Sequence, residues 1–272
     1  MARWLIILFL ISGFQQKVAA QDSLGDQIPN DYRLNLDYMK SYGPAALHVV
    51  KAPANFDTKD WIVTGSVLAG LTILYFNDLA VYEKFQSISS AQGQSFRWTE
   101  IFGNGVVALP SLAAIFIYGS VKNIDHSRNV ALTGLQAFVF GAEGAFLLKH
   151  LTHRVRPDME LAPNQWYGPF RRFDADAFPS GHAMRAFVVA TTLAGMYDDK
   201  PWLGAGFYAL ASLTAYGRLV SGDHWPSDVL AGAALGYFIG RGVVHFNKSN
   251  SKRKAKFIPF SGQGGFGLVM KF

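Results

Sequence analysis

The sequence predicts an all-α protein, a bundle of about six helices that is embedded in a membrane. Hydrophobic residues make up 50% of the 272 residues and charged residues only 16%, whereas an average soluble domain has roughly 25% charged residues. Six apolar segments lie between residues 61 and 246, and each is too long for a strand and suits a helix. No strand-like alternation of any length precedes the C-terminal tail.

The composition excludes several classes of protein. The chain has no cysteine, which excludes disulfides, cysteine-ligated zinc, iron–sulfur clusters and thiol catalysis. The net charge of +6 suits an anionic partner. That charge is spread too thinly to predict nucleic-acid binding, and no obligate protein partner is indicated.

The first twenty residues are typical of an export signal. Arg3 precedes an apolar core from Trp4 to Phe14, and the small residues 18–20 precede a cleavage point at Gln21. An uncleaved membrane anchor is the alternative, although this core is short of the roughly 20 residues that a span needs. Either way, the chain is directed to the cell envelope.

Four regions are expected along the chain. Residues 1–20 form the signal peptide, and residues 21–60, which are polar and contain three prolines, form an extended arm with one short helix. Residues 61–246 form the helical domain, and residues 247–272 form a basic tail. The predicted helices are Trp61–Tyr82, Ile101–Val121, Asn129–His150, His182–Tyr197, Trp202–Val220 and Asp228–Phe246.

Membrane embedding is favoured over a soluble bundle, which is the alternative. Ile101–Val121 contains no charged residue, and the connections at Lys122–Arg128 and Asp198–Pro201 are short. Small residues recur in the last two predicted helices, at 204–211 and 231–236. Such faces let helices approach closely.

The first of three motifs closes the third helix. Lys149 and Arg156 are seven residues apart, which is two helical turns, so we expect them on one face. Pro157 disfavours the α conformation at Arg156 and is expected to end the helix there.

The second motif, Pro179-Ser-Gly-His182, directly precedes an apolar helix. Ser180 suits an N-cap and Gly181 permits close approach of a ligand. The amide groups of a helix start bind anions, and His182 adds a proton donor.

The third motif lies between the last two helices. Arg218 closes one helix, and Pro226 suits the first turn of the next. His224 therefore precedes that helix and Asp228 lies in its first turn. The spacing predicts that the carboxylate fixes the imidazole tautomer and leaves the other ring nitrogen free to attack.

In an up-and-down bundle, the four helix ends that carry these motifs lie on one face. Cations and amides there suit the charge of a tetrahedral oxyanion, while one imidazole attacks and another protonates the leaving group. We therefore expect one active site at one end of the bundle.

Together the motifs resemble the signature of the type 2 phosphatidic acid phosphatase and vanadium haloperoxidase superfamily, on its branch of membrane-type phosphatases. That signature is K-x6-R-P, then P-S-G-H, then S-R-x5-H-x3-D. The one departure is Gly217, where the family usually has serine. The matching residues are Lys149, Arg156, Pro157, Pro179, Ser180, Gly181, His182, Arg218, His224 and Asp228.

The resemblance implies a role for each residue. His224 would be the nucleophile that forms a phosphohistidine, Asp228 would orient it, and His182 would be the general acid. Phosphatases of this family look metal-independent, so we expect no metal and no cofactor. The residues expected to bind phosphate are Lys149, Arg156, Ser180, Gly181 and Arg218.

The function implied is a phosphatase that removes phosphate from a lipid phosphate or lipid pyrophosphate. A vanadate-dependent haloperoxidase is one alternative, and a non-catalytic phospholipid-binding membrane protein is another. The expected partners are the lipid phosphate substrate and membrane lipids.

Other candidates carry less weight. His150 and His153 lack a third metal ligand of suitable spacing. Asp174 and Asp176 are interpreted as a solvated loop, and Arg171-Arg172 as a solvated pair or a contact to a second phosphate. The aromatic loop 166–170 suits a lipid or the membrane interface, and Phe266 to Phe272 is treated as tail.

Two signals conflict on sidedness. The basic residues after the last helix favour a cytoplasmic C-terminus, whereas a cleaved signal places the residues before Trp61 outside. Both hold if Trp61–Tyr82 lies on the membrane surface, because Asn77-Asp78 shortens its apolar run to about 16 residues. We therefore expect five crossings in the inner membrane and an active site that faces the periplasm; a soluble periplasmic protein is the alternative.

Overall fold

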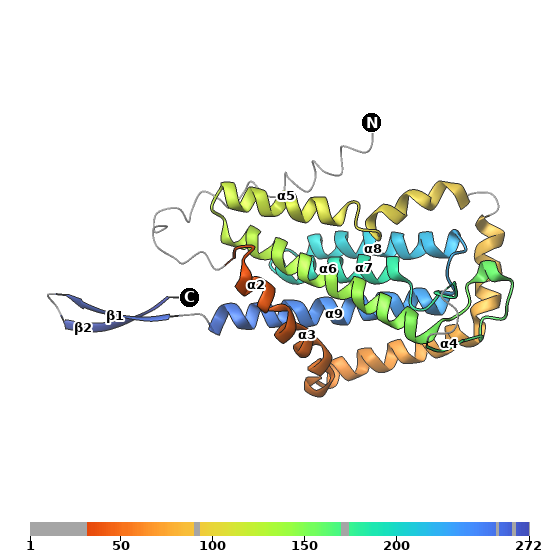
Figure 1. The fold of residues 1–272 in the computed structure, drawn as a ribbon, viewed down its shortest axis with the longest axis horizontal. Coiled ribbons are helices and arrows are strands. Elements are labelled where there is room, and N and C mark those ends of the chain that lie inside the picture. The colour runs from red at the N-terminus through yellow and green to blue at the C-terminus, as the bar shows by residue number, and fades with distance from the viewer. Residues whose placement is uncertain (1–31, 90–92, 170–173, 254–255, 263–264, 272) are drawn as a thin grey trace. The chain divides into compact units, whose positions relative to one another are not determined.

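A computed structural model describes residues 32–89, 93–169, 174–253, 256–262 and 265–271 (Figure 1). The predicted signal peptide and Arg171-Arg172 lie outside these residues. The described part of the helical domain is an all-α bundle, as predicted. Its helices are α4 (Thr58–Ser89), η3 (Gly93–Phe102), α5 (Ala108–Val121), α6 (Asp125–Thr152), η4 (Pro157–Met159), α7 (Gly181–Met196), α8 (Pro201–Val220) and α9 (Pro226–Arg253).

The residues before α4 are more helical than an extended arm. They form α2 (Leu36–Lys40), α3 (Tyr42–Lys51) and η2 (Ala52–Asn55). Tyr38 donates from its hydroxyl to the carbonyl of Leu132 at 3.0 Å, and Gln136 donates to the hydroxyl of Ser41 at 3.1 Å. These bonds fasten the segment to α6.

The closest packing in the bundle joins α7 and α9. A Cβ added at Gly232 would lie 2.4 Å from the carbonyl oxygen of Ser180, and one at Gly236 would lie 2.4 Å from that of Met184. Only glycine at these positions lets the two backbones meet, which bears out the predicted role of the small residues in 231–236. The start of α7 is thereby seated against α9.

The long first helix differs from its prediction. Asn77 and Asp78 do not interrupt α4, because Asn77 donates to the carbonyl of Ile73 within the helix and Asp78 is buried. Asp60 pairs with Arg241 in the middle of α9, and Asp78 accepts a hydrogen bond from the amide of Ser227 at the start of α9. The helix therefore runs along α9, and the expected interruption at Asn77-Asp78, on which its placement on the membrane surface depended, does not occur.

The apolar surfaces indicate embedding in a membrane. Among the described residues, three helices are long and apolar enough to cross: Thr58–Ser87, Asp125–Thr152 and Pro226–Asn250. Only 6% of the most apolar window of α4 is buried within the protein, and Phe76 on that helix is 79% exposed. Such contiguous apolar surface is rare on soluble monomers, so lipid is its natural environment.

Helix boundaries at the two ends also differ from expectation. In the uncharged segment Ile101–Val121, the α-helix α5 begins only at Ala108. The first two residues of the segment belong to η3, which ends at Phe102. The last helix continues beyond Phe246 to Arg253. The tail is not featureless: β1 (Lys256–Gly262) and β2 (Gly265–Lys271) pair antiparallel, with Lys256 opposite Lys271.

Candidate functional site

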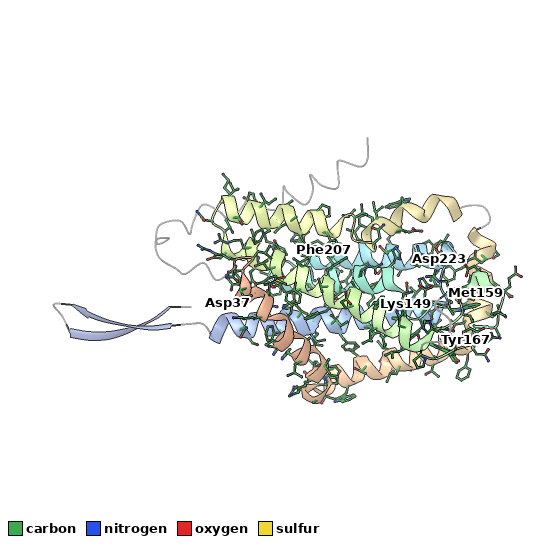
Figure 2. All side chains as sticks on the ribbon, in the orientation of Figure 1. Asp37, Lys149, Met159, Tyr167, Phe207 and Asp223 are labelled. Carbon is green, nitrogen blue, oxygen red and sulfur yellow. The ribbon has the colours of Figure 1, made fainter. Side chains whose placement is uncertain are left out.

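Four helix ends meet at one end of the bundle, as the sequence predicts. The last turns of α6 and α8 carry Lys149 and Arg218, while α7 and α9 begin there. The amide of Ser180 donates to the carbonyl of Asp228 at 3.0 Å, which ties the two helix starts together. Figure 2 shows Lys149 and Asp223 at this end of the bundle, and Asp37 toward the opposite end.

Lys149 and Arg156 converge, but not along one helix face. The helix α6 ends at Thr152 because His153 takes a left-handed conformation with φ 42°, and Arg156 is extended. The two cations instead meet on Asp176. Lys149 Nζ lies 3.3 Å from Asp176 Oδ2, and Arg156 Nε donates to Oδ1.

Asp176 is therefore an ion-pair partner, and its interpretation as a solvated loop residue is wrong. Its carboxylate is 37% exposed. Burial raises the pKa of Asp176, but the hydrogen bond from Arg156 and the charge of Lys149 outweigh this and hold the pKa below its usual range. The side chain is thus an anion held between two cations at the end of the bundle.

Arg218 is buried and also meets carboxylates. Its Nη1 lies 2.8 Å from Glu100 Oε1, and its Nη2 lies 2.7 Å from Asp223 Oδ2. Its Nε is buried and has no hydrogen-bond partner within the described ranges. A buried guanidinium donor without a partner is costly, so this nitrogen is available to an anion that enters the site.

Ser180 precedes α7 but does not cap it with its side chain. Its Oγ is fully buried and makes no hydrogen bond to any described residue. A Cβ at Gly181 would meet Arg185 at 3.4 Å and Lys149 at 3.6 Å, which is ordinary contact. The absence of a side chain at Gly181 thus leaves room beside the Ser180 hydroxyl and the amide groups of the helix start.

His224 lies in the loop between α8 and α9, held by one ring nitrogen. Its Nδ1 is 2.8 Å from the carbonyl oxygen of Ala177, which makes Nδ1 the protonated nitrogen because a carbonyl only accepts. Burial, together with the charges of Lys149, Arg156 and Arg218, lowers the pKa of His224 well below its usual value. The imidazole is therefore neutral, and its Nε2 carries a lone pair.

The expected hydrogen bond between Asp228 and His224 is not formed, and this part of the prediction is wrong. Asp228 Oδ1 accepts from Arg154 Nη1 at 2.6 Å, and Oδ2 accepts from the backbone amide of Trp225 at 3.0 Å. Because Trp225 is the next residue after His224, Asp228 positions the imidazole through the backbone.

The central residue that the sequence did not reveal is Arg154. Its side chain is 0% exposed, as are those of Asp78 and Asp228, with which it forms ion pairs at 2.6 Å each. It also donates to the carbonyl of Pro163 at 2.8 and 2.9 Å. No motif marks this arginine, since its partner Asp78 lies 76 residues earlier.

Aromatic rings cover the Arg154 cluster. The guanidinium carbon lies 4.9 Å from the ring centroid of Trp166 and 5.3 Å from that of Tyr75, within cation–π range. Trp166 also meets Phe178 edge-on at 5.2 Å. Trp166 of the predicted aromatic loop thus packs beside the site and is 38% exposed, whereas Phe170 lies outside the described residues.

The remaining candidates are placed as follows. His182 is half-buried in the first turn of α7, and Gly103 packs against its backbone. His153 is buried, with Nδ1 3.1 Å from the carbonyl oxygen of Ala175. No cluster of three metal-ligating side chains occurs in the part of the chain that the structure describes.

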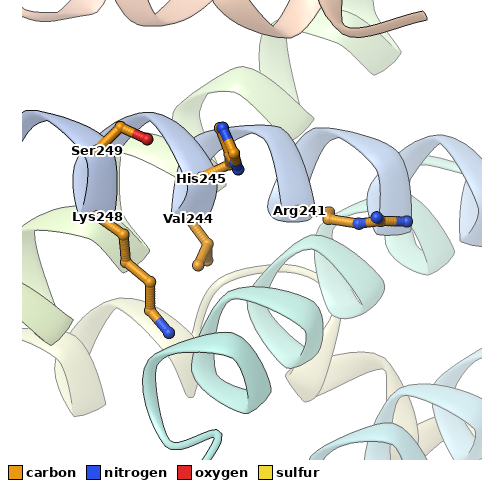
Figure 3. Close-up of a pocket in the computed structure, with 5 residues that line it drawn as sticks. All are labelled: Arg241, Val244, His245, Lys248 and Ser249. Carbon is orange, nitrogen blue, oxygen red and sulfur yellow. The ribbon is translucent and has the colours of Figure 1, made fainter. Parts of the chain in front are cut away.

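A cavity of 310 Å³ lies elsewhere on the molecule (Figure 3). Its lining residues lie in the C-terminal half of α9, about 20 to 30 Å along the helix from Asp228 at a rise of about 1.5 Å per residue. Its position separates it from the convergent motifs, so it is not the site described above. The lining residues are Arg241, Val244, His245, Lys248 and Ser249.

Fold and site together define a membrane-embedded helical protein with Lys149, Arg156 and Arg218 gathered at one end of its bundle. Residues 130–252, which contain all three motifs, match the family model of the PAP2 superfamily. Over these residues the chain is similar to this superfamily.

Similar proteins carry phosphatase names. A lipid A 1-phosphatase from Porphyromonas gingivalis is 43% identical over 67 residues, 24% of this chain and 15% of that one. An undecaprenyl-diphosphatase from Sulfolobus acidocaldarius is 25% identical over 167 residues, 61% of this chain and 71% of that one. A transmembrane PAP2 type phosphatidylglycerolphosphate phosphatase from Bacillus subtilis aligns with a TM-score of 0.48 and 23% identity, over 68% of this chain and 95% of that one.

Proposed function

We propose that this protein is a phosphatase that hydrolyses a lipid phosphate or lipid pyrophosphate. The observation that carries the proposal is the convergence of three cations and the buried Ser180 hydroxyl on the end of the bundle that holds a neutral His224. The names of the similar proteins support it. They do not favour the haloperoxidase alternative, and a protein that only binds phospholipid has no need of two histidines at the site.

The proposed reaction proceeds in two steps. The Nε2 lone pair of His224 attacks phosphorus, an N–P bond forms, and the bond to the leaving oxygen breaks as His182 protonates that oxygen. The oxygen of a water molecule then bonds to phosphorus as His182 accepts the water proton. The N–P bond breaks, its electron pair returns to Nε2 of His224, and inorganic phosphate leaves. Charge on the non-bridging oxygens is stabilised by Lys149, Arg156, Arg218 and the Ser180–Gly181 helix start.

Two groups support the nucleophile without touching the substrate. The carbonyl of Ala177 selects the tautomer with hydrogen on Nδ1. Asp228 holds the amide of Trp225, so it fixes the backbone from which His224 projects. In this proposal Asp228 is a positioning residue rather than a hydrogen-bond partner of the imidazole.

Phosphate release from purified protein tests the function. We expect the protein in detergent to release phosphate from at least one of phosphatidic acid, phosphatidylglycerol phosphate, lipid A and undecaprenyl pyrophosphate, and His224→Ala to lose at least about 10³-fold of that activity. His245→Ala is the matched control, because His245 is an exposed residue in the C-terminal half of α9, and we expect this variant to keep its activity. Activity of His224→Ala at a tenth of the wild-type value contradicts the assignment.

Metal independence is proposed from the same site, since cations of the chain supply the charge. A chelator should leave phosphate release unchanged. Inhibition by the chelator that magnesium reverses would show instead that a divalent cation takes part.

We propose that the site faces the periplasm from the inner membrane. The basic residues in the last turns of α9 and directly after it favour a cytoplasmic C-terminus, which places the start of α9 on the opposite side. Because α4 runs along α9, we propose that it also crosses. In this proposal the residues before Thr58 lie in the cytoplasm, and residues 1–20 do not act as a cleaved signal peptide.

Fusions to an export-dependent phosphatase reporter test this topology. A reporter after Gln92 or after Met159 should be active, and one after Asn55 should be inactive. Inactivity after Met159 would place the catalytic end in the cytoplasm. Activity after Asn55 would show that α4 does not cross.

A further inference from the structure

Each cation proposed to bind phosphate already has a carboxylate partner from this chain. Lys149 and Arg156 share Asp176, and Arg218 meets Glu100 and Asp223. A substrate phosphate that enters between these cations competes with the carboxylates for their charge and their donors.

We propose that Asp176 is the counter-ion that substrate phosphate displaces and that returns as product phosphate leaves, so that it sets how tightly the site holds phosphate. This inference rests on the proposed function. Asp176 is a positioning residue in this scheme, because it acts through Lys149 and Arg156 and never contacts the reacting atoms.

The contacts of Asp176 suit exchange. Its carboxylate bridges two cations that come from different segments, and it is 37% exposed, so the side chain has room to turn toward solvent. Asp223 is less free, because the hydroxyl of Ser221 also donates to its Oδ2. Replacing Asp176 alone removes the carboxylate contact of both Lys149 and Arg156.

The backbone around Asp176 is anchored while its side chain is exposed. Ala175 accepts from His153 at its carbonyl. The amide of Ala177 donates to the carbonyl of Arg154 at 3.0 Å, and the carbonyl of Ala177 holds His224. Lys149 Nζ also donates to the backbone carbonyl of Asp176. The carboxylate can therefore leave without disturbing the nucleophile or releasing Lys149.

The test compares orthovanadate binding by calorimetry to the purified full-length protein and its variants. Asp176→Asn keeps the shape of the side chain and removes its charge. We expect this variant to bind vanadate about tenfold tighter, because a negative charge beside the anion is gone. KM for the lipid phosphate should fall by a similar factor. Asp174→Asn, an exposed aspartate two residues earlier, is the matched control and should bind vanadate like wild type.

Opposite outcomes overturn the inference. If Asp176 only braces its loop, Asp176→Asn will lose kcat while vanadate affinity stays the same or weakens. Asp176→Glu, which keeps the charge, should bind vanadate within about threefold of wild type; affinity as tight as that of Asp176→Asn would also refute the role. If Asp176→Asn shows no melting transition, Asp176→Ser replaces it with the same expectations.

Failure of the proposed function is distinguishable from failure of this inference. If wild type releases phosphate from no lipid phosphate, the function is wrong. The vanadate titration needs no turnover, so it still decides whether Asp176 competes with an anion at Lys149 and Arg156.

Discussion

Replacing Arg154 with methionine should destabilise the protein more than any substitution at an exposed ion pair. The change removes a guanidinium that is 0% exposed and leaves Asp78 and Asp228, also 0% exposed, without their cation. Breaking a buried ion pair in this way costs about 3–5 kcal/mol. The aliphatic stem of methionine keeps much of the packing against Trp166, so the effect reports charge rather than volume.

The loss should be visible as a lower melting temperature in detergent, followed by tryptophan fluorescence. For a chain of this size, 1 kcal/mol shifts the melting temperature by about 2–4 °C, so Arg154→Met should melt about 10 °C below wild type. Activity should fall as well, because Asp228 loses the partner that orients it toward the amide of Trp225.

Arg241→Met is the matched control. Its guanidinium is 49% exposed and pairs with Asp60, whose side chain is 11% exposed, so we expect its loss to cost less than the loss of the fully buried Arg154. Adding Asp78→Asn to Arg154→Met should recover part of the lost stability, because one uncompensated carboxylate disappears. If Arg154→Met melts within about 2 °C of Arg241→Met, the buried cluster does not have the role assigned to it.

Three further predictions concern the reaction and the packing. Burial and nearby cations lower the pKa of His224, so its imidazole stays neutral below pH 6.5. We therefore expect kcat/KM to fall on the acid side with a midpoint below pH 6.5. A midpoint above pH 6.5 would contradict a neutral nucleophile. If His182 protonates the leaving oxygen, His182→Ala should lose at least about tenfold more activity on an alkyl phosphate than on an activated aryl phosphate, and equal losses would exclude this role. Gly232→Ala should lower the melting temperature by several degrees, because its Cβ would lie 2.4 Å from the carbonyl oxygen of Ser180 and overpacking costs about 1–3 kcal/mol. Gly206→Ala is the control and should melt like wild type, because a Cβ added at Gly206 has no neighbouring atom within 4 Å.

The residues of the site were predictable because their positions depend on local rules. Pro226 sets the start of α9, and Ser180 directly precedes α7, so the chain spacing alone places both motifs at helix ends. The alternating direction of the helices then brings these ends together. Helix periodicity and turn chemistry need only neighbouring residues, which is why this part of the prediction was confirmed.

The partners of those residues were not predictable in the same way. Asp228 lies four residues after His224, which suggested a direct contact, yet it binds Arg154 and the amide of Trp225. Asp176 lies in a loop whose composition resembles that of any solvated loop. Which cation a carboxylate meets depends on how separate segments pack, and spacing within one segment carries no such information.

The first helix shows the same limit most clearly. By itself, Asp78 in an apolar segment predicts an interruption, because an unpaired carboxylate in apolar surroundings is costly. The tertiary structure removes that cost: Arg154, 76 residues later in the chain, pairs with Asp78, and Ser227 donates two further hydrogen bonds to it. The sequence by itself therefore determined the helices and which motifs lie near their ends. Packing between distant segments decided which buried charges are compensated, and hence that α4 continues through Asp78 along α9.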